Sequence, residues 1–327
     1  MQRTFIDSSE SPTPLFNTIV SLLNLHAAAT KAFKGKRSRP RYADYIRSMP
    51  FNLMALNKEL KSGTYVQRKT KEFDLWCISG QKMRHISVPH LDDCVIQHAI
   101  YRVVFPLIDP KLIYDNYGCR LGKGTHKASN RCQYFIRQSP ADSWYLQLDF
   151  RKYYYNLDHG KLRDILLHLI HEERTVDLIL TQFPQDTDVG MNVGAMISQL
   201  MGMIYLDEFD HYIKRVLKIK HYIRYVDDVV IIGLTKEDCQ ALATHLTEYA
   251  RQKFKLEFSK IKIAPLSRGI NFVGYRTWSS KRIIRKRSMK TFKRNVRKHR
   301  LLSVRASLGH AKHTSSHTGM IDYMRNW

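Results

Sequence analysis

Cysteine, acidic residues and long apolar runs are all scarce in this sequence. Only five cysteines occur among 327 residues, and no two of them have the spacing C-x-x-C. An odd number of cysteines without that spacing indicates a reducing compartment and argues against a zinc site made of thiolates. No apolar run approaches the ~18 residues that a membrane-spanning helix needs, and the first ten residues are not typical of a secretory or mitochondrial leader. We therefore expect a cytoplasmic protein without a membrane partner.

The shortage of acidic residues leaves a strongly basic chain. Lysine and arginine number 54 against 29 aspartates and glutamates, so the formal net charge is +25 and the pI about 9.9. Such a charge predicts a polyanionic partner, most simply nucleic acid. A ribosome-like or merely basic protein is the alternative interpretation.

The positive charge is concentrated near the C-terminal end. Residues 281–300 contain eleven lysines and arginines and no acid. Met289, Phe292 and Val296 recur there at helical spacing, which predicts a helix with one packed face and one wide basic face. Such a face tracks a phosphate backbone without reading sequence. The candidate nucleic-acid contacts on this helix are Lys293, Arg294 and Arg297.

Against this basic background, the stretch RYVDDVV (residues 224–230) places two aspartates side by side between apolar runs. Aspartate is a favoured turn residue, and the flanking β-branched residues predict two strands joined as a hairpin. The pair Asp227–Asp228 is therefore either a solvated turn or a pair of metal ligands fixed at the end of a sheet. A partner elsewhere in the chain has to decide between the two.

The order of the predicted elements supplies that partner. Residues 34–42 are expected to form an extended arm or loop, 51–60 a short helix, 64–90 strands, and the chain after Pro89 a helix. From residue 144 onwards we expect a strand (144–150), a helix capped by Asp158, a long helix (197–216), the hairpin, a helix (236–252) and a strand (256–263). This is the β-α-β-β-α-β order of a ferredoxin-like fold, so the fold class is α+β. It brings Asp149, near the end of the first strand, beside the hairpin.

Two carboxylates on neighbouring strand ends are what a phosphoryl-transfer site with two Mg²⁺ ions requires. Mg²⁺ prefers carboxylate oxygens and needs only one or two from the protein, because substrate phosphates supply others. The ions activate an attacking 3′-hydroxyl and stabilise the leaving pyrophosphate. Asp149 and Asp227 therefore predict a nucleotidyl transferase.

Four segments in the same order carry a resemblance to a known family. They are NYGCRLGKGTHKA (116–128), LDFRKYYYNLDH (148–159), YVDD (225–228) and INFVGY (270–275). Together they resemble the ordered motifs of reverse transcriptases, over roughly residues 50–300. The resemblance implies that Asp149 and Asp227 bind two Mg²⁺ ions with help from the Phe150 carbonyl, and that Asp228 lies beside them as a further catalytic residue.

The same resemblance implies a set of residues around the incoming deoxynucleoside triphosphate. Tyr154 matches the aromatic gate against a ribose 2′-hydroxyl, unless it is a core aromatic. Lys82 and Arg84 match the clamp on the triphosphate, unless they lie in a solvated hairpin. Lys260 matches the lysine that protonates pyrophosphate. The segment that matches the primer grip consists of Phe272, Val273, Gly274 and Tyr275.

One departure from the family pattern narrows the interpretation. The segment VGAMISQ (193–199) has Val193 where most reverse transcriptases have glutamine and Gln199 where they have proline. We include both in the nucleotide-binding set, although Val193 is alternatively a packing residue. This variant resembles the reverse transcriptases of diversity-generating retroelements, which copy a template RNA with errors at adenines. A retron or group II intron enzyme, or a catalytically idle RNA-binding module, is the alternative.

The resemblance also implies an architecture and partners. We expect a right-hand polymerase with an N-terminal extension (1–50), mixed fingers (51–143), a ferredoxin-like palm with part of the fingers interleaved (144–280) and a helical thumb (281–327). The expected partners are a structured template RNA, the cDNA primer and product, and a basic oligomeric accessory protein, in a prokaryotic or phage-encoded system. His310, His313 and His317 have the spacing of metal ligands, but a flexible tail that contacts phosphates is the favoured interpretation.

Overall fold

The computed structural model describes residues 14–77 and 82–326, and it has the α+β composition that the sequence predicts. The chain divides into two compact units. Of the described residues, the first unit comprises 14–77, 82–111 and 157–205, and the second comprises 112–156 and 206–326. The predicted limits of fingers, palm and thumb do not coincide with this division and stay a prediction.

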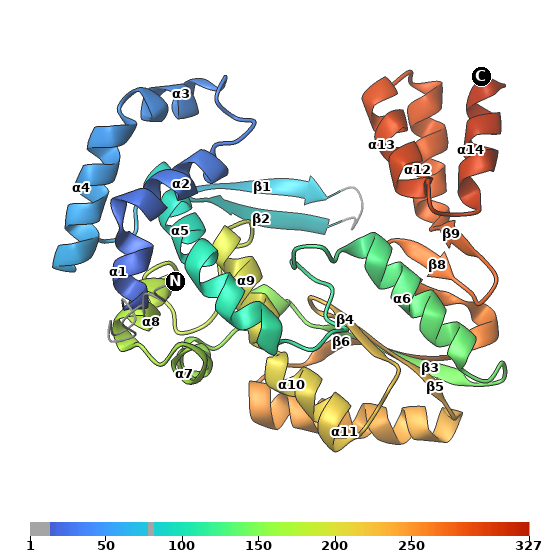
Figure 1. The fold of residues 1–327 in the computed structure, drawn as a ribbon. Coiled ribbons are helices and arrows are strands. Elements are labelled where there is room, and N and C mark those ends of the chain that lie inside the picture. The colour runs from blue at the N-terminus through green and yellow to red at the C-terminus, as the bar shows by residue number, and fades with distance from the viewer. Residues whose placement is uncertain (1–13, 78–81, 327) are drawn as a thin grey trace, which may run out of the picture. The chain divides into compact units, whose positions relative to one another are not determined.

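The first unit is mainly helical and is built around one long helix, α5 (Figure 1). Its elements are α1 (Leu15–Val20), α2 (Leu22–Ala32), α3 (Pro40–Arg47), α4 (Met49–Ser62), β1 (Lys71–Cys77), β2 (Lys82–Val88), α5 (Leu91–Ile108), α7 (His159–Ile170), α8 (Glu173–Leu180) and α9 (Met196–Ile204). Helices α1, α2 and α9 pack on α5, whose side chains Val95, Ile96 and Ile100 are fully buried. The antiparallel hairpin β1–β2 and the cap of α7 by Asp158 confirm the predicted elements.

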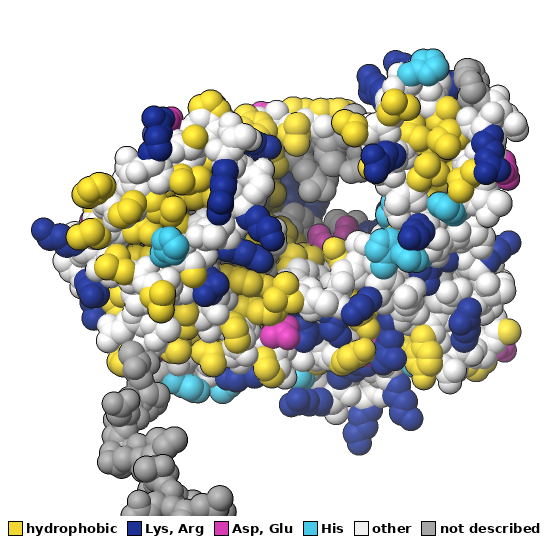
Figure 2. Space-filling view, turned by 45° about the horizontal axis from the view of Figure 1, so that its top comes forward, with side chains coloured by type: hydrophobic (Ala, Val, Ile, Leu, Met, Phe, Trp, Pro, Cys, Tyr) yellow, Lys and Arg dark blue, Asp and Glu magenta, His cyan; other side chains and the backbone are white. Residues whose placement is uncertain are grey.

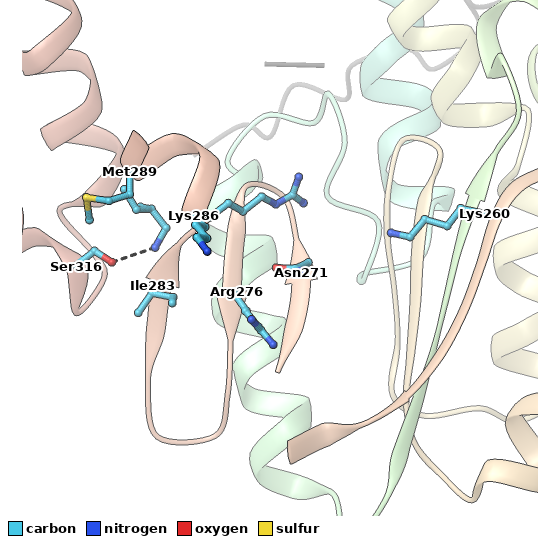
Figure 3. Close-up of a pocket in the computed structure, with 9 residues that line it drawn as sticks. Lys260, Asn271, Arg276, Ile283, Lys286, Met289 and Ser316 are labelled. Carbon is cyan, nitrogen blue, oxygen red and sulfur yellow. Dashed lines mark hydrogen bonds between the residues drawn. The ribbon is translucent and has the colours of Figure 1, made fainter. Parts of the chain in front are cut away.

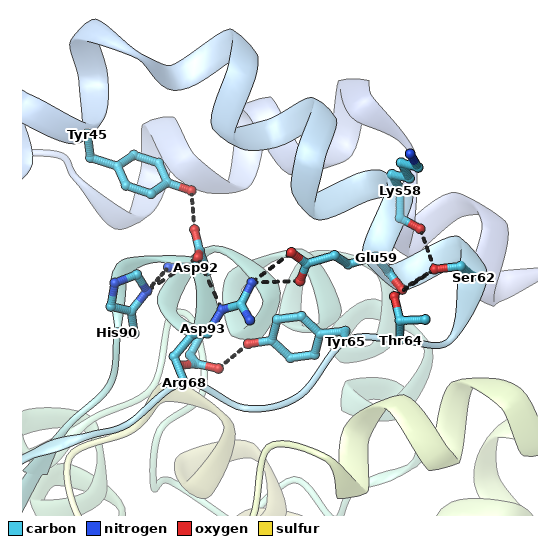
Figure 4. A network of polar contacts seen from close by, with 10 residues as sticks. All are labelled: Tyr45, Lys58, Glu59, Ser62, Thr64, Tyr65, Arg68, His90, Asp92 and Asp93. Atoms are coloured by element: carbon cyan, nitrogen blue, oxygen red, sulfur yellow. Dashed lines mark hydrogen bonds and ion pairs between the residues drawn. The ribbon is translucent and has the colours of Figure 1, made fainter.

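Polar contacts fix the start of α5 (Figure 4). The Tyr45 hydroxyl donates to Asp92 Oδ1 at 2.8 Å, and the Tyr65 hydroxyl donates to Asp93. Burial raises the pKa of the Asp93 carboxyl. Arg68 makes two bonds with the Glu59 carboxylate, at 2.6 and 2.8 Å. Because both aspartates lie in the first turn, they also interact favourably with the helix dipole. The network ties α3 and α4 to the helix that organises the unit.

A four-stranded antiparallel sheet forms the centre of the second unit. Its strands are β3 (Trp144–Phe150), β4 (Tyr222–Tyr225), β5 (Asp228–Leu234) and β6 (Phe258–Pro265), in the spatial order β4-β5-β3-β6. With α11 (Lys236–Phe254) between β5 and β6, this order is the ferredoxin-like arrangement that the sequence predicts. Helix α6 (Thr125–Gln138) packs on β4 and β5, and α11 packs on β3 and β6.

A second, three-stranded sheet leads into the C-terminal helices (Figure 1). Strands β7 (Ile270–Phe272), β8 (Tyr275–Thr277) and β9 (Arg282–Ile284) are followed by α12 (Lys286–Arg297), α13 (Leu301–Ala311) and α14 (Ser316–Arg325). Phe292 and Val296 are buried in the core of this helical group, so the predicted basic helix is confirmed. It begins at Lys286 because residues 282–284 pair with β8.

One predicted element is right only in part, and another is wrong. The expected arm or loop at 34–42 is a series of turns as far as Arg39 and gives way at Pro40 to α3, since proline is well suited to the first turn of a helix. The expected long helix 197–216 is three pieces, namely α9, the short α10 (Asp207–His211) and a π-helical turn (Tyr212–Val216). The interruption after Ile204 falls where the chain passes from the first unit to the second. No helix within residues 14–77 and 82–326 combines the length and the apolar character of a membrane span.

Candidate active site

The two adjacent aspartates lie at a two-residue turn. Tyr225 pairs with Asp228, so Val226 and Asp227 connect β4 to β5. Val226 has a φ of 59°, which is rare for a β-branched residue and indicates a strained turn. The backbone N–H of Phe150 donates to the Asp227 carbonyl at 3.2 Å. This bond ties the end of β3 to the turn. It therefore brings Asp149, the residue before Phe150, next to the aspartate pair, as the sequence predicts.

Strand register brings three charged side chains onto one face of the sheet. Asp149 of β3 is the Cα partner of Asp228 on one side and of Lys260 on the other. Residues directly opposite each other in an antiparallel pair share a face. The Ser259 hydroxyl lies 2.8 Å from Asp149 Oδ2 and donates to it. Two carboxylates and one ammonium group thus meet at the end of the sheet.

A buried glutamine connects this cluster to β7. Gln147 lies two residues before Asp149 and on the same face, and its side-chain amide donates to Asp228 Oδ1 and to the Asn271 carbonyl, both at 2.9 Å. Its own oxygen accepts from Lys260 Nζ at 3.3 Å. Every polar atom of the amide therefore has a partner. Sequence reasoning missed Gln147 and Ser259; the alternation of β3 was the available signal for the glutamine.

The electrostatics of the cluster favour a bound cation. The pKa of Asp228 is raised to about 7, chiefly by burial and also by the charges of Asp149 and Asp227, while Gln147 and Lys260 oppose the shift. No group of three or more His, Cys, Asp or Glu side chains in the described part of the chain forms a ready-made metal cage. Mg²⁺ does not need one, because water and substrate phosphates complete its shell. The three aspartates therefore fit the predicted metal as an open, all-oxygen site.

Tyr154 belongs to a short 3-10 turn after β3, Tyr153–Tyr155. Tyr153 is buried and Tyr154 is half-buried. Burial raises the pKa of the Tyr154 hydroxyl, and the charges of Cys119 and Asp227 raise it further. Tyr154 therefore lies within electrostatic reach of the catalytic turn, which is where the proposed gate would have to be.

The remaining nucleotide-binding candidates lie in the first unit. Lys82 and Arg84 belong to β2, and their side chains lie outside the described residues. The N–H of Ser87, on the same strand, donates to the Val193 carbonyl at 3.4 Å. Gln199 is exposed on α9. The structure therefore connects the segment around Val193 to the strand that carries Lys82 and Arg84.

The candidate primer grip is a second strained turn. Phe272 pairs with Tyr275, and the residues between them, Val273 and Gly274, have φ values of 44° and 96°. The Tyr275 hydroxyl lies 3.0 Å from His126 Nδ1 and 3.1 Å from His310 Nδ1. These contacts join the turn to α6 and to α13.

The histidines near the C-terminus do not form the expected flexible tail. His310 lies in α13 and contacts Tyr275, and His317 lies in α14. The ring of His313 packs edge-on against that of His126. No metal cluster involves them within the described residues. The expectation of a flexible tail is therefore wrong, because this segment folds into helices and two of its histidines contact residues of β8 and α6.

A basic pocket is lined in part by Lys260, the cross-strand partner of Asp149 (Figure 3). Its volume is about 660 Å³, and it is lined by residues of β6 to β9 and of the helices that follow. Four of the lining side chains are cationic: Lys260, Arg276, Arg285 and Lys286. Farther along, Lys293, Arg294 and Arg297 are exposed on α12. Figure 2 shows lysines and arginines across the visible face with few acidic side chains. The surroundings of the cluster thus suit a polyanion.

Comparison with known proteins agrees with this geometry. The family model described as reverse transcriptase (RNA-dependent DNA polymerase) matches residues 69–277, well over half of the chain. The group II intron-encoded protein LtrA of Lactococcus lactis subsp. cremoris is 22% identical over 291 residues, which cover 67% of this chain and 48% of that protein. Protein YkfC of Escherichia coli is 25% identical and is covered over 72% of both chains. The chain thus spans about half the length of the intron-encoded protein.

A solved structure supports the same fold. Apo telomerase from Candida tropicalis, truncated from its C-terminal domain, superposes with a TM-score of 0.50 at 13% sequence identity and covers 72% of this chain and 60% of that one. Such low identity speaks for the fold alone, which is that of a right-hand polymerase. The family match, the ferredoxin-like sheet and the paired aspartates lead to one conclusion: the chain belongs to the reverse transcriptase family.

Proposed function

We propose that the protein is an RNA-directed DNA polymerase in which Asp149, Asp227 and Asp228 hold two Mg²⁺ ions, with the Phe150 carbonyl as a further ligand. The observation that carries the proposal is the pairing of Asp149 with Asp228 across β3 and β5, together with the bond from the Phe150 N–H to the Asp227 carbonyl. Divalent ions bound there would lower the pKa of the primer 3′-hydroxyl and neutralise negative charge on the phosphates.

The chain's own residues prepare this site. Ser259 orients the Asp149 carboxylate and Gln147 orients that of Asp228. Lys260, bound only weakly to Gln147 at 3.3 Å, is available to release that contact and protonate the departing pyrophosphate. Tyr154 excludes a ribose 2′-hydroxyl, and Lys82 and Arg84 bind the triphosphate of the incoming deoxynucleotide.

The primer strand is expected to lie along the basic pocket beside the turn Phe272–Tyr275. The four cations that line the pocket provide phosphate contacts, and Ile283 and Met289 add apolar lining. Lys293, Arg294 and Arg297 continue the basic surface along α12 and contact the duplex backbone. Phosphate contacts of this kind position a strand without reading its sequence.

Two subtypes remain in competition, and each has an observation in its favour. The similarity to the group II intron-encoded protein favours copying of a structured RNA by an intron-type enzyme of bacterial origin. The segment 193–199 favours a diversity-generating retroelement, which would add a basic oligomeric accessory protein and errors at template adenines. A glutamine at position 193 would offer a hydrogen bond worth about 1 kcal/mol, which valine lacks.

The fidelity of the enzyme separates these subtypes. Purified wild-type protein and Val193→Gln should copy an adenine-rich RNA template, with misincorporation counted opposite each template base. A retroelement-type enzyme is expected to misincorporate mainly at adenines, and Val193→Gln is expected to reduce those errors by several-fold. A low and even error spectrum in the wild type would favour the intron-type enzyme. Absence of any extension would favour an idle RNA-binding module.

A further inference from the structure

A fully buried ion pair lies beneath the catalytic turn. Arg224 of β4 donates through Nε to Asp210 Oδ1 at 2.7 Å and through Nη2 to Asp210 Oδ2 at 2.6 Å. Neither side chain is exposed to solvent. The Tyr222 hydroxyl donates to the same carboxylate. Such bidentate geometry fixes the plane of the guanidinium group and aims its remaining nitrogen.

That remaining nitrogen binds the catalytic turn. Arg224 Nη1 donates to the carbonyl of Val226 at 2.8 Å. Val226 immediately precedes Asp227 and is the residue held at a φ of 59°. A non-glycine residue in this conformation persists only where its surroundings determine it strongly. The Arg224 side chain is thus in direct contact with the strained peptide that presents Asp227.

The backbone of Arg224 and a neighbouring loop restrain the same turn. The Arg224 N–H donates to the Asp115 carbonyl at 3.0 Å, and its carbonyl accepts from the Tyr117 N–H at 2.9 Å. Gly118, the next residue of that loop, packs against Val226 so closely that a Cβ atom would lie 2.7 Å from it. Arg224 therefore restrains the turn through a hydrogen bond, and Gly118 restrains it through close packing.

Stability alone does not account for this pair. Burying two charges costs desolvation, and replacing a buried ion pair with apolar residues of similar size is often neutral or stabilising. An apolar side chain at position 224 would, however, leave the Val226 carbonyl without its donor. The directional bond to the turn is the property that an apolar replacement cannot reproduce.

We propose that Arg224, oriented by Asp210, is a positioning residue that holds the Val226–Asp227 turn in the geometry that binds metal. The inference rests on the proposed role of Asp227 as a metal ligand. Arg224 contacts neither substrate nor metal, and it acts through its hydrogen bond to the Val226 carbonyl. Loss of the guanidinium should therefore weaken metal binding and lower the turnover number, while the fold is retained.

The test is a variant that removes the whole buried polar group at once, Arg224→Met with Asp210→Leu and Tyr222→Phe, so that no buried charge is left unpaired and the Val226 carbonyl alone loses its donor. Three measurements are compared with wild type: the melting temperature, the affinity for Mn²⁺ followed by the paramagnetic resonance of the free ion, and kcat of primer extension at saturating substrates. We expect an unchanged or higher melting temperature, Mn²⁺ affinity at least threefold weaker, and kcat at least tenfold lower. Tyr222→Phe alone is the matched control, since it leaves the bonds from Arg224 to Asp210 and Val226 in place, and it should match wild type.

A folded triple variant with wild-type kcat and Mn²⁺ affinity would overturn the inference and leave the pair a purely structural feature. If the triple variant does not fold, Arg224→Lys decides, because lysine keeps the charge but lacks the fork that serves Asp210 and Val226 together. A folded Arg224→Lys protein with wild-type kcat overturns the inference as well. Asp227→Asn separates this outcome from a failure of the proposed function: normal extension by Asp227→Asn refutes the role of Asp227 itself.

Discussion

Gly118→Ala is the smallest change that should disturb the catalytic turn. Gly118 is buried, and its φ is not positive, so alanine meets no backbone strain of its own there. The added Cβ would lie 2.7 Å from both Cγ2 and the backbone nitrogen of Val226. A side chain can rotate away from such a contact, but a backbone nitrogen moves only with the turn.

The size of the effect follows from the overlap. Ordinary contacts of a Cβ atom begin at 3.4 Å, so the turn or the loop has to yield by ~0.7 Å to accommodate alanine. Misplacement of reacting groups by about 1 Å can cost about a hundredfold in rate. We therefore expect kcat of primer extension to fall between tenfold and a hundredfold, which corresponds to about 1.4 to 2.7 kcal/mol in the activation free energy.

The assay is single-nucleotide primer extension on an RNA template at saturating substrates, with the melting temperature measured in parallel. Gly309→Ala is the matched control, because no heavy atom lies within 4 Å of its added Cβ and its helix α13 accepts alanine. It should extend primers at the wild-type rate. Wild-type kcat in a folded Gly118→Ala protein would refute the claim that the loop sets the position of Asp227.

Two further predictions concern charge. The fold raises the pKa of Asp228 from an ordinary 3.8 to about 7. The contribution of this carboxyl to the stability of the metal-free protein should therefore be greatest below pH 4 and should fall as the pH rises towards 7. Asp228→Asn should therefore raise the free energy of unfolding by an amount that grows across that window to on the order of 4 kcal/mol in urea titrations; a gain that is independent of pH would contradict the burial of this charge. Neutralising Lys293, Arg294 and Arg297 together should flatten the slope of log affinity for single-stranded RNA against log salt by ~0.7 for each phosphate that the variant no longer binds. An unchanged slope, equal to that of an Arg251→Gln and Lys253→Gln control on α11, would mean that α12 is merely solvated.

Most of the fold could be predicted because it depends on local patterns. Alternation over 144–150 gave β3, the spacing of Leu162 and Leu166 gave α7, and Asp158 capped it as expected. The order of strands and helices was enough for the ferredoxin-like sheet. Where the pattern continued but the packing changed, as between residues 197 and 216, the prediction failed, since a continuous apolar period carries no sign that the chain is leaving one compact unit for another.

The candidate site was predictable in its charged members, the three aspartates and Lys260, but not in the groups that hold them. Aspartates in a basic chain stand out, so Asp149, Asp227 and Asp228 could be chosen from sequence. The groups that hold them could not, because their partners are remote: Gln147 meets Asn271, and Gly118 meets Val226. Arg224 reads as one more basic residue in a basic sequence. Only its complete burial against Asp210 distinguishes it.

The cluster of Asp149 and Asp227 is proposed to catalyse DNA synthesis on an RNA template. The most direct measurement is Mg²⁺-dependent primer extension by purified wild-type protein and by Asp227→Asn, with Asp142→Asn, an exposed aspartate ahead of β3, as the control. Loss of a metal ligand removes several kcal/mol of transition-state stabilisation, so Asp227→Asn should reduce extension by about a thousandfold or more while its melting temperature stays near that of wild type. The Asp142→Asn protein should extend normally. Extension by a folded Asp227→Asn protein at a rate close to wild type would contradict a catalytic role for this cluster.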